Sequence, residues 1–182
     1  EKNILTGSHM TGGGLTDAGR EYVRECQRLG ILVDVSHISD EAFWDIMDIT
    51  EAPIVASHSN LRSVCGHSRN LTDDMYRAIA QTGGTAGINL CAPFIKEEGA
   101  DFDATCDHIF RMLELVPDGK HISLGGDLDG CDELPAGFTG IQSYNALADR
   151  LFERGLDEAT IRNIYWNNTM GVMDRAVRNH QK

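Results

Sequence analysis

Residues 31–37, ILVDVSH, set the pattern that decides the fold, because a short apolar run ends there on a polar residue. Three later runs repeat the pattern, namely PIVASH at 53–58, GTAGIN at 84–89 and HISLGGD at 121–127. Each run precedes a segment with helical character, and strands of a parallel sheet read as continuous apolar runs because both their faces are buried. The sequence therefore predicts a parallel β/α protein whose functional residues lie at the carboxyl ends of its strands.

Helices are expected around these four strands, since glycine, proline and capping residues bound stretches with apolar positions at helical spacing. The expected helices cover about 17–29, 40–49, 75–81, 104–115, 143–154 and 158–174. Four consecutive βα units form either an open parallel sheet or half of an eight-stranded barrel. A whole barrel typically needs about 250 residues, and this chain has 182.

Composition and charge disfavour several classes of partner. Apolar residues make up 41% of the chain and charged residues 24%, which is ordinary for a globular domain. The formal net charge of −12 disfavours nucleic acid and anionic membrane surfaces, since both attract clustered Lys and Arg. No transmembrane run or signal-peptide pattern occurs, so we expect no membrane partner.

The five cysteines are widely spaced, at positions 26, 65, 91, 106 and 131, and no CxxC pair occurs. This spacing argues against a cysteine-type zinc site. It predicts reduced, buried thiols and a cytoplasmic location.

Two histidines, His37 and His58, end the first two predicted strands. Neighbouring parallel strands lie about 4.8 Å apart, so imidazoles at their ends can converge on one metal ion. We predict that both are metal ligands. A catalytic zinc takes three protein ligands and an open position, so two histidines form an incomplete site.

Three further residues are predicted to face the same edge of the sheet. Asn89 ends the third run, and Asp127 ends the fourth inside GGDLDG, where it could ligate a metal, accept a proton or bind a substrate ammonium group. Arg69 lies in the loop HSRN, and a guanidinium near a metal site suits bidentate capture of a carboxylate. The alternative for Arg69 is an ion pair with Asp73 or Asp74.

Several stretches together resemble the membrane dipeptidase (renal dipeptidase) family of zinc peptidases. These are TGGGLTDAGREYVRECQRLGILVDVSH at 11–37, APIVASHSNLRSVCGHSRNLTDD at 52–74, GGDLDG at 125–130 and YWNNTMGVM at 165–173. The resemblance runs from roughly residue 14 to residue 173, with the stretches in the order found in the family.

The resemblance implies a (β/α)8 barrel with two zinc ions that hydrolyses dipeptides. His37 and His58 match two histidine ligands of its metal site. Arg69 matches the residue that binds the terminal carboxylate of the substrate, and Asp127 matches the acidic residue near its amino group and the attacking water. Phe94 stands where some members have a substrate-contacting Tyr, so it is assigned with Asn89 to substrate binding.

The chain also departs from the family pattern. The family's His-x-Asp pair and bridging Glu belong to the N-terminal half of the barrel, and no HxD sequence occurs here. The fold class predicted is therefore α/β, with parallel β/α units corresponding to the C-terminal half of a (β/α)8 TIM-like barrel. At most one partial zinc site is expected.

Residues 14–182 are interpreted as this half-barrel, and residues 1–13 as an N-terminal extension. GSHM at 7–10 is common as a vector-derived sequence, which would make His9 foreign to the protein. The segment also continues into TGGGLTDAGR at 11–20 without a break in composition, so both interpretations stay open.

The predicted function is zinc-dependent dipeptide hydrolysis in a parent protein, with these residues alone inactive or very weak. One alternative is another metal-dependent hydrolase of the amidohydrolase type. A second is a non-catalytic assembly fragment, because a half-barrel exposes strand edges that favour a homo-oligomer or association with a complementary half.

Overall fold

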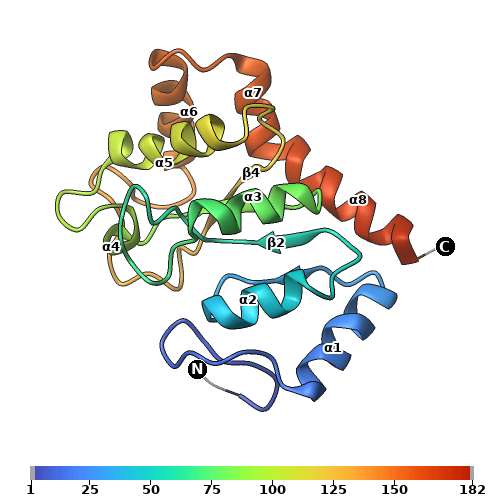
Figure 1. Cartoon of the computed structure of the whole chain (residues 1–182). Helices are drawn as coiled ribbons and strands as arrows, with labels where there is room; N and C mark the ends of the chain where they lie inside the picture. Colours follow the sequence, from blue (N-terminus) through green and yellow to red (C-terminus); the bar gives the residue numbers. More distant parts are fainter. Residues whose placement is uncertain (1–2, 181–182) are drawn as a thin grey trace.

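A computed structural model describes residues 3–180, and its centre is a parallel sheet with the strand order β1-β2-β3-β4 (Figure 1). The strands are β1 (Val33–Asp34), β2 (Ile54–Ala56), β3 (Thr85–Asn89) and β4 (Ile122–Gly126). The helices are α1 (Asp17–Arg28), α2 (Asp40–Met47), α3 (Asp73–Gln81), α4 (Ala92–Ile95), α5 (Phe102–Leu115), α6 (Ser143–Glu153), α7 (Glu158–Arg162), the π-helical turn η1 (Asn163–Asn167) and α8 (Asn168–His180). The predicted parallel α/β class is confirmed.

The four strands lie in sequence order, so every connection carries the chain to the next strand along the sheet. Ile54 pairs with Val33, Ala86 with Ala56, and Ile122 with Ala86. Figure 1 shows α3 between α2 and α5, which is consistent with the order of β1, β2 and β3, the strands that precede them. Because parallel strands end at one edge of the sheet, the residues after β1 to β4 are brought to a common side.

The core lies between this sheet and the helices, where apolar side chains from both layers are buried. Ile54 and Ile122 of the sheet are fully buried, as are Ile79 of α3 and Ile109 of α5. Several helices begin after a small polar residue that accepts a hydrogen bond from the first turn, as Thr16 does for α1 and Ser39 for α2.

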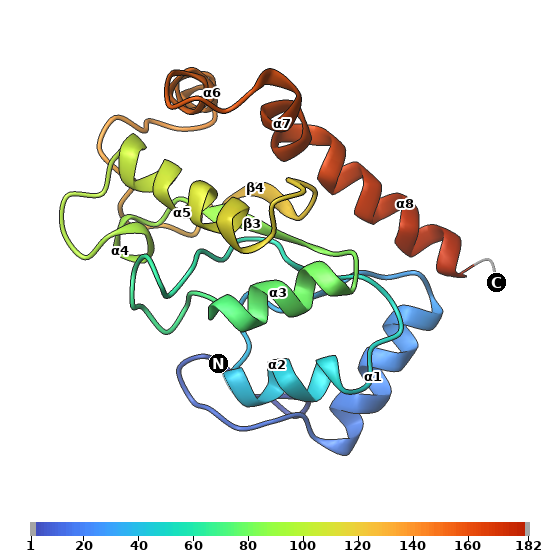
Figure 2. The same cartoon turned by 45° about the horizontal axis from the view of Figure 1, so that its top comes forward.

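The chain after β4 differs from the single helix expected over 158–174. It forms α7, the π-helical turn η1 and α8 in succession. Asn168, just after the π-helical turn, is buried and donates from Nδ2 to the carbonyls of Gly119 and Ile122, at 2.9 and 2.8 Å. Figure 2 shows α8 extending from this side of the sheet toward α1, which it contacts. The short helix α4 also lies in a stretch expected to be a loop.

The prediction of reduced thiols is wrong for two of the five cysteines. Cys91 and Cys131 form a disulfide across 40 residues of chain, while Cys26, Cys65 and Cys106 are free. The two partners follow β3 and β4, which are adjacent strands, so their Cα atoms are only 5.1 Å apart. Linear spacing could not reveal this pair. The cytoplasmic location stays a prediction.

Residues 3–13 pack against the rest of the fold. Ser8 is buried and forms isolated bridges with Gly12 and Ile38. The backbone N–H of Thr16 donates to Leu5 O at 2.9 Å. The boundary at residue 13 stays a prediction. Within residues 3–180, no helix combines the length and apolar character needed to cross a bilayer.

His108 of α5 links three parts of the core through both ring nitrogens, and replacing it with Ala is expected to destabilise the fold by about 3–5 kcal/mol. Its Nδ1 accepts from Leu61 N–H at 3.2 Å, so Nε2 carries the proton and donates to Ile95 O at 2.9 Å. His108→Ala leaves two buried backbone groups unpaired and a cavity beside them. Urea unfolding measures the loss, and His67→Ala, at a partly exposed ring, should cost about 1 kcal/mol.

The same residue should make stability depend on pH. Burial lowers the pKa of His108, so the unfolded chain binds more protons at this residue than the folded protein does. Its contribution to the free energy of unfolding is complete above the unfolded pKa of about 6.5 and is lost as the pH falls toward the folded value. An unfolding midpoint that responds to pH equally in His108→Ala and in the unmodified chain would contradict this assignment.

Candidate functional site

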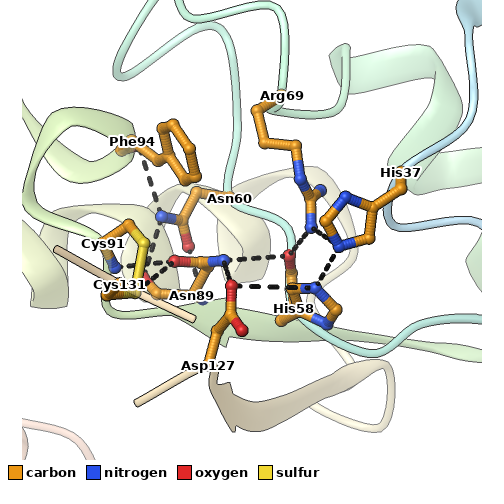
Figure 3. The surroundings of a disulfide bond; sticks show 9 residues. All are labelled: His37, His58, Asn60, Arg69, Asn89, Cys91, Phe94, Asp127 and Cys131. Atoms are coloured by element: carbon orange, nitrogen blue, oxygen red, sulfur yellow. Dashed lines mark hydrogen bonds and ion pairs between the residues drawn. A yellow bond between two sulfur atoms is a disulfide. The ribbon is translucent and has the colours of Figure 1, made fainter. Parts of the chain in front are cut away.

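The two histidines predicted as metal ligands meet at the carboxyl edge of the sheet. His37 follows β1 and His58 follows β2, and their Nε2 atoms are 2.9 Å apart (Figure 3). Glycine at 125 lets β4 pass close to His58, because a Cβ there would meet Ser57 O and lie 2.9 Å from His58 Cα. The predicted convergence of the imidazoles is confirmed, and their role as ligands stays a prediction.

Asp34 and Ser57 orient His58, a role that the sequence analysis missed. Asp34 accepts hydrogen bonds from the hydroxyls and backbone N–H groups of Ser36 and Ser57. Burial alone would raise the pKa of Asp34, but these four hydrogen bonds outweigh burial and lower it. Ser57 Oγ gives its proton to Asp34, so it accepts from Nδ1 of His58 at 2.6 Å. The repeated Ser-His pairs at 36–37 and 57–58 were the available signal.

The electrostatic state of the two imidazoles suits a metal ion. Burial, and then the charge of Arg69, lowers the pKa of His37 to about 4. The same two causes lower the pKa of His58, so both rings are neutral at neutral pH. With its proton on Nδ1, His58 directs the lone pair of Nε2 toward His37. Ligands at Zn–N distances of about 2.1 Å lie roughly 3–3.5 Å apart, so the pair fits two positions of one zinc-like ion.

Arg69 reaches the same edge from the long loop after β2. It is buried, with Nη1 donating to Ser59 Oγ at 2.7 Å and Nη2 donating to His58 O at 3.1 Å. Its Nη2 also lies 3.3 Å from His37 Nε2. Burial lowers the pKa of Arg69 to about 10.

The alternative ion pairs for Arg69 do not form. Asp73 pairs with Arg111 at 2.6 Å, and Asp74 pairs with Arg77 at 2.9 Å. Within residues 3–180, Arg69 has no carboxylate in hydrogen-bond or ion-pair contact. A buried guanidinium without a carboxylate partner is costly, which favours a site for an anionic group from outside the chain.

Asn89 and Asp127 complete the edge on the other side of His58 (Figure 3). Asn89 is fully buried, and its Nδ2 donates to Asp127 Oδ2 at 3.2 Å and to His58 O at 3.4 Å. Asp127 Oδ2 is 3.8 Å from His58 Nε2. Asp127 has a φ of 59°, a left-handed conformation that is uncommon outside glycine but more accessible to Asp than to most residues. The structure thus brings four predicted residues together around His58.

Phe94 of α4 lies at the margin of this group. Its ring packs against His67, with centroids 4.5 Å apart, and its carbonyl accepts from Asn60 Nδ2 and Asn70 Nδ2. His9, which lies in the segment that resembles a vector-derived sequence, contacts His37: its backbone N–H donates to His37 O at 3.1 Å, and the two ring centroids are 6.0 Å apart. No local sequence pattern could predict this contact, because His9 and His37 are 28 positions apart.

This parallel β/α scaffold, with two neutral histidines, a carboxylate and a buried arginine at the carboxyl ends of its strands, has the features of a metal-dependent hydrolase. Comparison with known sequences agrees: the sequence model of the family described as membrane dipeptidase (peptidase family M19) matches residues 3–182. The chain belongs to this family.

Similar proteins include an uncharacterized dipeptidase of Schizosaccharomyces pombe, 37% identical over 164 residues that cover 89% of this chain and 40% of that protein. An uncharacterized protein encoded in the pqqA 5′ region of Klebsiella pneumoniae is 34% identical over 171 residues, covering 92% of this chain and 63% of that protein. The chain thus spans roughly two fifths to three fifths of the length of these curated relatives.

Two solved structures are similar in fold and sequence. A metallo peptidase from Rhodobacter sphaeroides, liganded with a phosphinate mimic of the dipeptide L-Ala-D-Ala, has a TM-score of 0.87 and 32% identity over 93% of this chain and 49% of its own. The dipeptidase AC, also of family M19, has a TM-score of 0.86 and 34% identity over 93% of this chain and 51% of its own. The predicted fold class, β/α units corresponding to half of a TIM-like barrel, is confirmed.

Proposed function

We propose that this chain carries the substrate-binding half of a zinc-dependent dipeptidase. The observation that carries the proposal is Arg69, a buried guanidinium without a carboxylate partner in the described residues, beside two neutral imidazoles. A dipeptide would supply a carboxylate partner for Arg69, because its free carboxylate lies a short distance from its scissile amide. The phosphinate dipeptide mimic bound by the similar peptidase supports this substrate class.

His37 and His58 would hold the metal ion through Nε2, and a bound Zn²⁺ would polarise the scissile carbonyl and acidify its water. The His and Asp of the family's His-x-Asp pair, its bridging Glu and the second ion would come from residues outside these 182. This division is consistent with the coverage of the relatives, in which the chain matches about half of each solved dipeptidase.

The chain's own residues would orient the substrate and move its protons. Arg69 would bind the terminal carboxylate, with its guanidinium held in place by Ser59 and the backbone of His58. Asp127, on the opposite side of His58, would bind the substrate amine or take a proton from the attacking water. Asn89 would hold the Asp127 carboxylate through the hydrogen bond from Nδ2. Phe94 would line the substrate side near His67.

Hydrolysis of free and C-terminally amidated dipeptides by the complete protein, meaning the longest gene product that contains these residues, tests the proposal. A zinc dipeptidase that uses Arg69 should prefer the free substrate strongly. Equal hydrolysis of both, or hydrolysis of esters and amides that lack a carboxylate, would favour the alternative of another metal-dependent amidohydrolase.

The 182-residue chain by itself should hydrolyse dipeptides at least about 100-fold more slowly than the complete protein at saturating Zn²⁺. Replacing a residue that only hydrogen-bonds to a metal ligand lowers metal affinity or activity by about 10–100-fold. The proposal leaves this chain without some of the metal ligands themselves, so the loss should be at least as large. Single-turnover assays with a chromogenic amino-acid detection measure the difference. Comparable turnover by the isolated chain would show that another residue, such as Asp34 or His67, completes the site.

The edges of the sheet suggest the partner of the isolated chain. Within the described residues, β1 and β4 each pair on one side only. Unpaired strand edges favour association, so we propose that the chain forms a homo-oligomer or pairs with a complementary half-barrel. Size-exclusion chromatography over a range of concentrations distinguishes these assemblies from a monomer. We also propose a cytoplasmic location, in which the Cys91–Cys131 pair would be exposed to cellular reductants.

A further inference from the structure

We propose that reduction of the Cys91–Cys131 disulfide creates a second metal site, in which both cysteine sulfurs and the Asp127 carboxylate bind one thiophilic divalent cation such as Zn²⁺. This site lies beside the histidine pair but shares no histidine with it. Cation binding at this site does not depend on the proposed dipeptide hydrolysis, whereas its effect on the role of Asp127 rests on that proposed function.

The three donor atoms are already gathered at one place (Figure 3). The Sγ atoms of Cys91 and Cys131 and a carboxylate oxygen of Asp127 all lie within 4.8 Å of one another. Zn–S bonds of about 2.3 Å and Zn–O bonds of about 2.1 Å place the ligands of a tetrahedral ion roughly 3.5–4 Å apart. Once the S–S bond is broken, side-chain rotations alone would bring the three atoms to this spacing.

Backbone contacts independent of the disulfide hold the two loops together. Ala92 N–H, next to Cys91, donates to Glu133 O at 2.9 Å, two residues beyond Cys131. The N–H of Cys91 donates to Asn89 Oδ1 at 2.6 Å. Leu90 N–H, next to Cys91, donates to Gly126 O, next to Asp127, at 2.9 Å. The donor set should therefore stay assembled when the cysteines are reduced.

The chemistry balances with a dithiol as the reductant. The dithiol supplies two electrons and two protons, so the S–S bond breaks, two protein thiols form and the dithiol is oxidised to its own disulfide. The cation then displaces the two thiol protons and forms two metal–thiolate bonds without changing its oxidation state. Cys131 is partly exposed and the side chain of Asp127 is 25% exposed, so both the reductant and the cation have access.

Occupancy of this site would affect the neighbouring one. Asp127 Oδ2 accepts from Asn89 and lies 3.8 Å from His58 Nε2. A cation bound to the two thiolates would draw the carboxylate toward the sulfurs and away from His58. The cysteine pair would thus connect the redox state to the residue proposed to handle the substrate's protons.

Cadmium titration of the purified chain tests the proposal, because Cd²⁺–thiolate bonds give an ultraviolet charge-transfer absorption that histidine and carboxylate ligands do not. One sample is reduced with a dithiol, the dithiol is removed under anaerobic conditions, and the protein is titrated with Cd²⁺. An oxidised sample is titrated in parallel. We expect the absorption to saturate at one Cd²⁺ per chain after reduction and to be absent before it. A reduced sample with no thiolate absorption, or an oxidised sample with the same absorption, would overturn the proposal.

Matched variants locate the site. Cys91→Ser and Cys131→Ser should each abolish the one-to-one thiolate absorption, and Asp127→Asn should weaken Cd²⁺ binding by at least about 10-fold. Cys65→Ser, at a buried thiol that donates to Pro93 O, should leave it unchanged. His58→Gln should also leave it unchanged, which separates this site from the histidine pair. Absorption retained in Cys91→Ser would assign the thiolates to other cysteines and reject the site.

Discussion

Replacing Arg69 with Lys is expected to lower kcat/KM for free dipeptides by about 30- to 5000-fold in the complete protein. This fold-change corresponds to a free-energy cost of about 2–5 kcal/mol, which is typical for the loss of one charge-assisted pair in a partly buried site. A guanidinium binds a carboxylate through two parallel hydrogen bonds, whereas an ammonium group acts as a point charge. Lysine would also lose the simultaneous donation to Ser59 Oγ and His58 O.

Substrates with a blocked carboxyl terminus provide the internal comparison for Arg69→Lys. Their hydrolysis should hardly change, because they offer no carboxylate to Arg69. Arg62→Lys is the matched control, since Arg62 lies in the same loop but pairs bidentately with Asp40, both contacts at 2.6 Å. Equal losses on free and blocked substrates would show that Arg69 only maintains the loop.

Replacing Asp127 with Asn is expected to reduce kcat by about 10²- to 10⁴-fold, the usual contribution of a positioned acid or base. The substitution keeps the size of the side chain but removes its charge and its ability to accept a proton. Asn89 Nδ2 can still donate to the new amide oxygen, so the local hydrogen bond at 3.2 Å has a replacement. The loss should therefore reflect chemistry rather than folding.

Asp129→Asn is the control for this substitution, because Asp129 lies two residues away in the same glycine-rich loop and is exposed. It should leave kcat within about twofold of the unmodified protein, as expected of a surface substitution. Unfolding midpoints of the two variants should agree. A loss of less than about 10-fold in Asp127→Asn would remove Asp127 from proton transfer.

Features that depend on neighbours in the sequence could be predicted. The apolar runs at 31–37, 53–58, 84–89 and 121–127 marked the four strands, and the helices expected over 17–29 and 40–49 begin at the observed residues. The parallel order of the strands followed, and parallel strands end at one edge of a sheet. The sequence therefore predicted the observed convergence of His37 and His58, because each ends one of two consecutive apolar runs.

The tertiary structure alone decided which groups contact one another across long stretches of chain. Arg69 could have paired with the following acidic residues, but the loop folds back and buries it beside His37. The Cys91–Cys131 disulfide joins loops 40 residues apart, and Asp34 orients His58 through Ser57. Periodicity and capping act over a few residues, whereas these contacts depend on how the whole chain packs. The sequence by itself therefore determined the strands and the edge where the site lies, and packing determined the partners and charge states of its residues.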